Sequence, residues 1–73
     1  MEKYCFLLTF RCNNGTNDSL MEWKVLTDSE ELAFQDIETT RKLCLECFNE
    51  MCDSEADACV LINSIRVRNK VDT

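Results

Sequence analysis

The sequence predicts a small α+β domain of β-β-α-β order, in which a three-stranded antiparallel sheet has one long helix packed on one face. Two segments rich in aromatic and β-branched residues flank an Asn-Gly turn. A stretch with apolar residues at helical spacing follows, and a third strand-like segment comes near the end of the chain. With 73 residues, no proline and one glycine, the chain is expected to form a single domain, residues 1–73, built mainly of regular elements.

Residues 3–12 are expected to form the first strand. Large apolar side chains at the even positions alternate with Cys5, Leu7, Thr9 and Arg11 on the other face. A strand that is apolar on both faces near its middle is typical of the centre of a sheet. We therefore expect the strand order 2-1-3, with the third strand antiparallel to the first.

Residues 13–19 are expected to form a turn, because Asn14-Gly15 tolerates positive backbone φ angles. The next segment, 20–26, alternates apolar side chains with Glu22 and Lys24. This alternation predicts a half-buried strand, and its charged face suits a sheet edge.

The helix is expected over residues 28–52. Thr27 followed by Glu30 has the spacing of a capping box, with Asp28 and Ser29 as alternative caps. An apolar stripe at helical spacing predicts the buried face. Its members are Ala33, Ile37, Thr40, Cys44, Cys47, Phe48 and Met51.

The Thr39-Thr40 pair lowers helix propensity, so a break at that point is an alternative to one continuous helix. Residues 53–57 are expected to form a polar connection. Residues 58–68 are rich in valine, leucine and isoleucine and predict the third strand, followed by a frayed tail over 69–73.

The predicted helix also has an acidic face opposite the apolar stripe, with Lys42 as the only cation among the acids. Glu38–Lys42 and Lys42–Glu46 are spaced four apart, and each pair would add a few tenths of a kcal/mol. We expect this acidic face to bind a basic surface of another protein. The expected binding residues are Glu31, Glu38, Glu46, Glu50 and Asp53.

The overall charge favours the same class of partner. The chain has 8 Lys+Arg against 14 Asp+Glu, a net charge of −6. Because phosphate binding depends on neutralisation by Lys and Arg, direct binding to nucleic acid is disfavoured. The alternative is that the acidic residues only keep a small protein soluble.

The composition argues against an enzyme. The chain has no histidine, the commonest general base, and its single glycine excludes a glycine-rich phosphate loop. Its carboxylates are spaced so that they fall on a solvated helix face. We therefore assign no catalytic residue and no cofactor.

Six cysteines are the most unusual feature of the composition, at positions 5, 12, 44, 47, 52 and 59. We favour free thiols in a reducing cytosol, where cysteine behaves as a small buried apolar residue. A disulfide scaffold would need an oxidising compartment. A dithiol redox site normally lies at a helix N-terminus, whereas Cys44 and Cys47 lie deep in the predicted helix.

The alternative function that we retain is a zinc-stabilised structural module. Tetrahedral zinc sites use four cysteine or histidine ligands, and four of the six cysteines fall within sixteen positions. The expected ligands would be Cys44, Cys47, Cys52 and Cys59. Against this site, the Cys44–Cys47 pair lies inside a helical pattern without the glycine or proline of a knuckle turn.

No membrane or export segment is expected, since the early apolar run over residues 4–10 is too short for either role. We therefore expect a cytoplasmic protein. In size, acidity and lack of catalytic groups the chain resembles small phage or mobile-element proteins of the anti-restriction and anti-CRISPR type. This resemblance is one of general character rather than of a motif, and it implies an inhibitor or adaptor.

A homodimer is also expected. One helix can cover only one face of the sheet, whereas the first and third strands are apolar on both faces. A second copy could bury the uncovered face or an exposed strand edge. Leu32 and Leu43 flank the helix stripe and are candidate rim contacts with a partner, unless they are ordinary surface residues.

Overall fold

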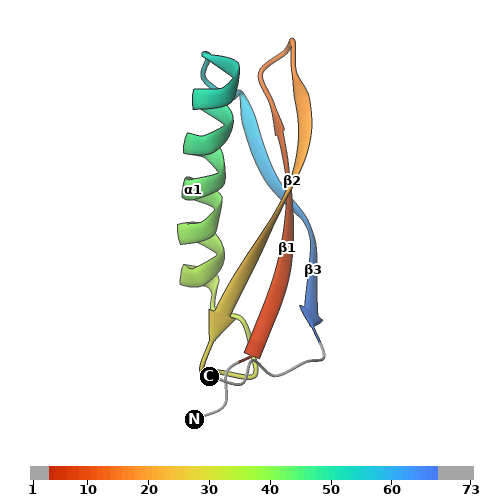
Figure 1. Cartoon of the computed structure of the whole chain (residues 1–73), viewed down its shortest axis with the longest axis vertical. Coiled ribbons are helices and arrows are strands. Elements are labelled where there is room, and N and C mark those ends of the chain that lie inside the picture. The colour runs from red at the N-terminus through yellow and green to blue at the C-terminus, as the bar shows by residue number, and fades with distance from the viewer. Residues whose placement is uncertain (1–3, 68–73) are drawn as a thin grey trace.

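Three antiparallel strands and one helix form the part of the chain that the computed structural model describes, residues 4–67. The elements are β1 (Tyr4–Asn13), β2 (Asp18–Thr27), α1 (Phe34–Cys52) and β3 (Ala58–Val67). Figure 1 shows α1 lying along one side of a long, twisted sheet, in a molecule of 43 × 19 × 17 Å. The predicted α+β class and β-β-α-β order are therefore confirmed. Residue 3 of the first predicted strand, residue 68 of the third and the tail 69–73 lie outside the described residues.

The sheet has the order β2-β1-β3, with both pairs antiparallel, as predicted. β1 and β2 pair from Tyr4↔Thr27 to Asn13↔Asp18, so the hairpin is longer than the pattern of alternation indicated. Gly15 in the turn has a φ of 87°. The turn is closed by asparagine side chains that accept backbone N–H bonds, as in Asn13 Oδ1 with the Gly15 N–H at 2.7 Å.

The core lies between α1 and the inner face of the sheet, defined as the face toward the helix. Alternation along β1 places its even-numbered side chains on this face, and α1 adds side chains from one stripe. Each large apolar side chain that is fully buried contributes about 1.5–3 kcal/mol. The buried cluster consists of Phe6, Leu8, Phe10, Cys12, Cys44 and Phe48.

The predicted capping box at Thr27 is wrong, because α1 begins six residues later than predicted, at Phe34 rather than at residue 28. Ala33 is the N-cap and has no side-chain capping bond. Thr27 instead closes a local turn: its Oγ1 accepts the Ser29 N–H at 2.8 Å and donates to the Ser29 carbonyl at 3.0 Å. Hydroxyl side chains bond nearby backbone groups in turns as readily as at helix caps, and here the turn prevails.

α1 is continuous through Thr39 and Thr40, so the alternative of a break at this pair is also wrong. Both hydroxyls donate to the carbonyl four residues earlier, at 2.9 and 2.8 Å. These bonds satisfy the threonine side chains without interrupting the helix. The buried positions are Thr40, Cys44 and Phe48, whereas Ala33 and Met51 of the predicted stripe are exposed.

α1 ends at Cys52, as predicted, and Asp53 has the left-handed φ of 51° that commonly follows a helix. Asn49 holds the following turn, since its Oδ1 accepts the Ala56 N–H at 2.7 Å. The Asp57 N–H then donates to the Asn13 carbonyl at 2.7 Å, which attaches the start of β3 to the end of β1.

Candidate functional site

Three thiols from three different elements meet at one point of the core. Cys12 lies on β1, Cys44 on α1 and Cys59 on β3, and their sulfur atoms all lie within 4.8 Å of one another. The Cys12 Sγ is 3.6 Å from the Cys44 Sγ and 3.1 Å from the Cys59 Sγ. Cys12 and Cys44 are fully buried, and Cys59 is half-buried. We call these three residues the thiol cluster.

Strand register and helix packing bring the three thiols together. Cys12 and Cys59 are direct cross-strand partners in the β1–β3 ladder, so their side chains share a face. That face is the inner one, because Cys12 belongs to the core cluster. Cys44 lies on the buried stripe of α1, one turn from Thr40 and one turn from Phe48, and this stripe packs onto the two strands.

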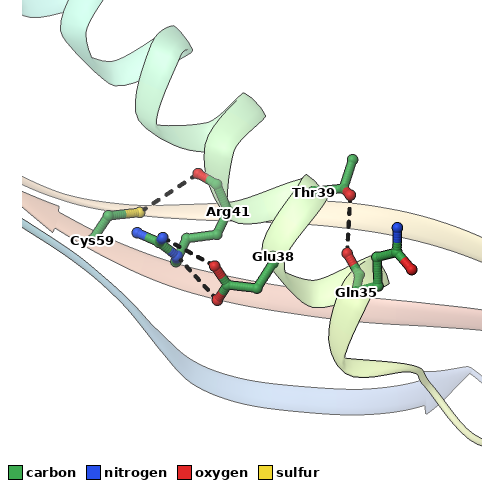
Figure 2. A network of polar contacts seen from close by, with 5 residues as sticks. All are labelled: Gln35, Glu38, Thr39, Arg41 and Cys59. Carbon is green, nitrogen blue, oxygen red and sulfur yellow. Dashed lines mark hydrogen bonds and ion pairs between the residues drawn. The ribbon is translucent and has the colours of Figure 1, made fainter.

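The immediate surroundings of the thiol cluster add another sulfur and two groups from the neighbouring elements. The Met21 Sδ lies 3.6 Å from the Cys44 Sγ. The Cys59 Sγ lies 4.0 Å from the Arg41 carbonyl oxygen, as Figure 2 shows. The Trp23 indole Nε1 is buried, and within the described part of the chain it has no hydrogen-bond acceptor.

The electrostatics keep at least two of the thiols protonated near neutral pH. Burial raises the pKa of the Cys12 thiol, and its contacts with Cys59 and Cys44 raise it further. Burial also raises the pKa of Cys44, although Cys12 and the nearby Trp23 indole act in the opposite direction. Reactive cysteines have lowered pKa values, so this arrangement does not suit a nucleophile.

The structure brings together only part of the sequence-predicted metal set. Cys44 and Cys59 belong to the thiol cluster, whereas the half-buried Cys47 and Cys52 do not. The sequence reasoning missed Cys12. A usable signal existed, because Cys12 follows Phe10 by two positions and so shares its face, but its partner on β3 depends on the register between the strands.

The predicted acidic helix face is only partly present. Glu31 lies in the loop before α1 and not on the helix. Glu38 forms an ion pair with Arg41 at 3.1 Å (Figure 2) and not the predicted one with Lys42. This pairing lowers the pKa of Glu38. The predicted Lys42–Glu46 ion pair is likewise not formed in residues 4–67.

The remaining predicted residues, Glu46, Glu50 and Asp53, are all exposed on or directly after α1. One apolar side chain, Leu43, shares their side of α1 and is 49% exposed. Met51 is also exposed, but it follows the buried Phe48 by three positions and so lies at the end of the buried stripe. The last turn of α1 contains no basic residue. We call Leu43, Glu46, Glu50 and Asp53 the outer helix face.

A second exposed apolar surface lies on the sheet face away from α1. β1 is largely shielded there, since Cys5 is buried and Leu7 half-buried, but β2 and β3 leave large side chains in solvent. A depression of about 330 Å³ adjoins them and is bordered by the ion pair of Arg11 with Asp18. We define the outer sheet face by Leu20, Leu26, Val60, Ile62 and Ile65, each at least 50% exposed.

Within residues 4–67, no helix is long and apolar enough to cross a membrane. The chain shows no significant match to protein-family models, to curated proteins or to solved structures. Any functional inference therefore depends on the geometry of the surfaces and of the thiol cluster.

Proposed function

We propose that this chain is a small acidic module without catalytic activity that binds a basic surface of another protein. The observation that carries the proposal is the outer helix face. Glu46, Glu50 and Asp53 are exposed there, and within the described residues none of them forms an ion pair. Their charges remain available to a partner.

The position of these charges strengthens their field. A helix C-terminus has a partial negative charge, which basic side chains usually balance. Here α1 has no basic residue in its last turn, and Asp53 directly follows the helix. Local repulsion of this kind costs some stability, and a cationic partner would relieve it. Sites that violate a local stability rule are often functional.

Leu43 supplies the apolar part of such an interface. Glu46 and Glu50 follow Leu43 by three and seven positions, so these three side chains share one side of the helix. Stable interfaces combine an apolar centre with a polar rim. The proposal therefore keeps Leu43 as a partner contact, as the sequence suggested, but places it at the apolar centre and not at the rim.

The proposed partner surface is one that normally binds nucleic acid, because a basic groove for phosphates is also a target for an acidic helix. This would make the chain an inhibitor or adaptor of the anti-restriction or anti-CRISPR type, acting in the cytoplasm, where its six cysteines would stay reduced.

The test compares two double charge reversals of equal size. Glu46→Lys/Glu50→Lys changes the outer helix face, and Glu22→Lys/Glu31→Lys changes exposed acids on β2 and in the loop before α1. In quantitative pull-downs, we expect the first variant to lose partners that wild type and the second variant retain. Capture should also weaken at high salt. Equal capture by both variants, or capture insensitive to salt, would refute the proposal.

Competition then tests the inhibitor role. A captured partner that binds nucleic acid should release it when the wild-type chain is added, and the Glu46→Lys/Glu50→Lys variant should not compete. If the partner binds both together without loss of affinity for the nucleic acid, the chain is not an inhibitor of that site.

We also propose that the chain forms a weak homodimer through the outer sheet face. Each of the five side chains is about half exposed, so its burial would contribute on the order of 1 kcal/mol. Two copies bury ten such side chains, but association costs at least about 4 kcal/mol. About 6 kcal/mol remains, which corresponds to a dissociation constant of roughly tens of micromolar.

Trp23 does not compete for this face, since it packs against the inner core. Sedimentation at several concentrations tests the dimer. A strictly monomeric protein near about 100 μM, or a dimer unaffected by Ile65→Asp, would refute this interface.

A further inference from the structure

We propose that the thiol cluster binds one thiophilic d10 metal ion, Zn(II) or Cu(I), through the thiolates of Cys12, Cys44 and Cys59. This site differs from the set that the sequence suggested, because it includes Cys12 and excludes Cys47 and Cys52. It is independent of the proposed partner-binding surface, and its test needs no partner.

The first argument is the spacing of the sulfur atoms. With metal–sulfur bonds of about 2.3 Å, tetrahedral thiolates lie about 3.8 Å apart, and trigonal ones about 4.0 Å apart. The Cys12–Cys44 sulfur distance is 3.6 Å, the Cys12–Cys59 distance is 3.1 Å, and no pair exceeds 4.8 Å. Shifts of about 1 Å or less, within the reach of side-chain rotation, would therefore complete either geometry.

The second argument is the chemistry of the donors. The ligand atoms of the cluster are all sulfur, and the Met21 thioether lies 3.6 Å from the Cys44 Sγ. Soft thiolate and thioether ligands favour Cu(I) and Zn(II) over hard ions such as Mg²⁺ and Ca²⁺, which require oxygen. Three sulfur ligands complete the coordination of Cu(I). Zn(II) would add a fourth ligand, either the Met21 thioether or a water molecule, which could reach the ion beside the half-buried Cys59.

The third argument is a buried hydrogen-bond donor in the core beside the cluster. The Trp23 Nε1 is buried and has no acceptor among residues 4–67, and Trp23 packs against the core that contains Cys12 and Cys44. A metal-bound thiolate would be an acceptor for such a donor. Donors around the ligands are typical of metal sites.

The main competing use of the cluster is a Cys12–Cys59 disulfide, since the two residues are cross-strand partners. That bond would need its sulfurs at about 2.05 Å and would consume two of the three ligands. It also leaves the convergence of Cys44 and Met21 unexplained. A metal ion uses all three thiols and links β1, α1 and β3 at one point.

The experiment uses the reduced, metal-free chain with Zn(II) and Cu(I) added in separate titrations. Native mass spectrometry should show one ion per chain, and bound metal should raise the melting temperature. Because thiol ligands lose their protons when they bind a metal, binding in weak buffer near pH 7 should release up to about three protons. Failure to bind either ion, or a chain that remains disulfide-bonded after reduction, would overturn the proposal.

Cysteine-to-serine variants identify the ligands. Cys59→Ser should lower metal affinity at least about tenfold, while Cys47→Ser and Cys52→Ser, which change equally half-buried thiols of α1, should leave it unchanged. The reverse pattern would overturn the assignment in favour of the sequence-predicted set. Because serine at the fully buried Cys12 could prevent folding, Cys12→Ala is used there and its fold is checked by circular dichroism. A folded Cys12→Ala protein with unaltered metal affinity would also overturn the proposal.

Discussion

Replacing Phe48 with alanine tests the proposed packing of α1 on the sheet. Phe48 is 0% exposed and is among the largest fully buried side chains of the core. Removing a buried phenylalanine costs about 3–5 kcal/mol through lost burial and the cavity left behind. The better helix propensity of alanine returns about 0.5 kcal/mol. We therefore expect a net loss of about 2.5–4.5 kcal/mol.

This loss is a large part of the total stability. A chain of 73 residues is expected to have an unfolding free energy of about 4–11 kcal/mol. Each kcal/mol corresponds to about 4–8 °C in melting temperature for a domain of this size. Phe48→Ala should thus melt at least about 10 °C below wild type. At the low end of the expected stability, part of the population would be unfolded at room temperature.

Phe34 provides a matched control on the same helix. It is the first residue of α1 and is 75% exposed. Phe34→Ala therefore deletes the same side-chain atoms as Phe48→Ala, but from a position in solvent and not from the core. We expect a change within about 0.5 kcal/mol. Urea denaturation followed by the fluorescence of Trp23, which packs against the core, measures both variants. Similar losses for the two variants, or a loss below about 1 kcal/mol for Phe48→Ala, would refute the described orientation of α1.

Two further predictions concern the end of the helix and the hairpin. Asp53 has a φ of 51°, which glycine adopts freely and alanine does not. Asp53→Gly should therefore be about 1 kcal/mol more stable in urea denaturation than Asp53→Ala, although both variants remove the same charge. Equal stabilities would show that the left-handed geometry is not required. The hydrogen bond and charge of Arg11 lower the pKa of Asp18 below its ordinary value of 3.8. The stabilisation from this pair should therefore be complete above that pH and be lost as the pH falls through the lowered pKa, so the difference in melting temperature between wild type and Asp18→Asn should disappear in strong acid. A difference that stays constant down to the lowest pH would contradict this assignment.

The strand pattern and the sheet order could be predicted from the sequence because they depend on local periodicity. Side chains of a strand alternate between faces, and β1 has large apolar residues at every even position from Tyr4 to Phe10. Its apolar character on both faces also indicated the central position that the sheet order confirms. The end of α1 at Cys52 followed from the polar residues after it.

The start of the helix could not be predicted in the same way. The residues from Thr27 to Glu30 satisfy the spacing of a capping box, but the same hydroxyl groups form a turn at the end of β2. Whether these residues form a helix cap or a turn depends on the distance that the chain must span from the edge strand β2 to the face of the sheet where α1 packs. That distance is a property of the assembled fold and not of the segment.

The candidate sites show the same division. From the sequence alone, the chain is acidic, lacks histidine and has six thiols, and these facts limit its chemistry. Only the tertiary structure pairs Glu38 with Arg41, removes Glu31 from the helix face and joins Cys12 to Cys44 and Cys59. The physical reason is the sequence separation of the residues involved. Alternation and helical spacing follow from backbone geometry over a few residues. The thiol cluster instead requires contacts between residues 32 and 47 positions apart, and strand register and helix packing together determine those contacts.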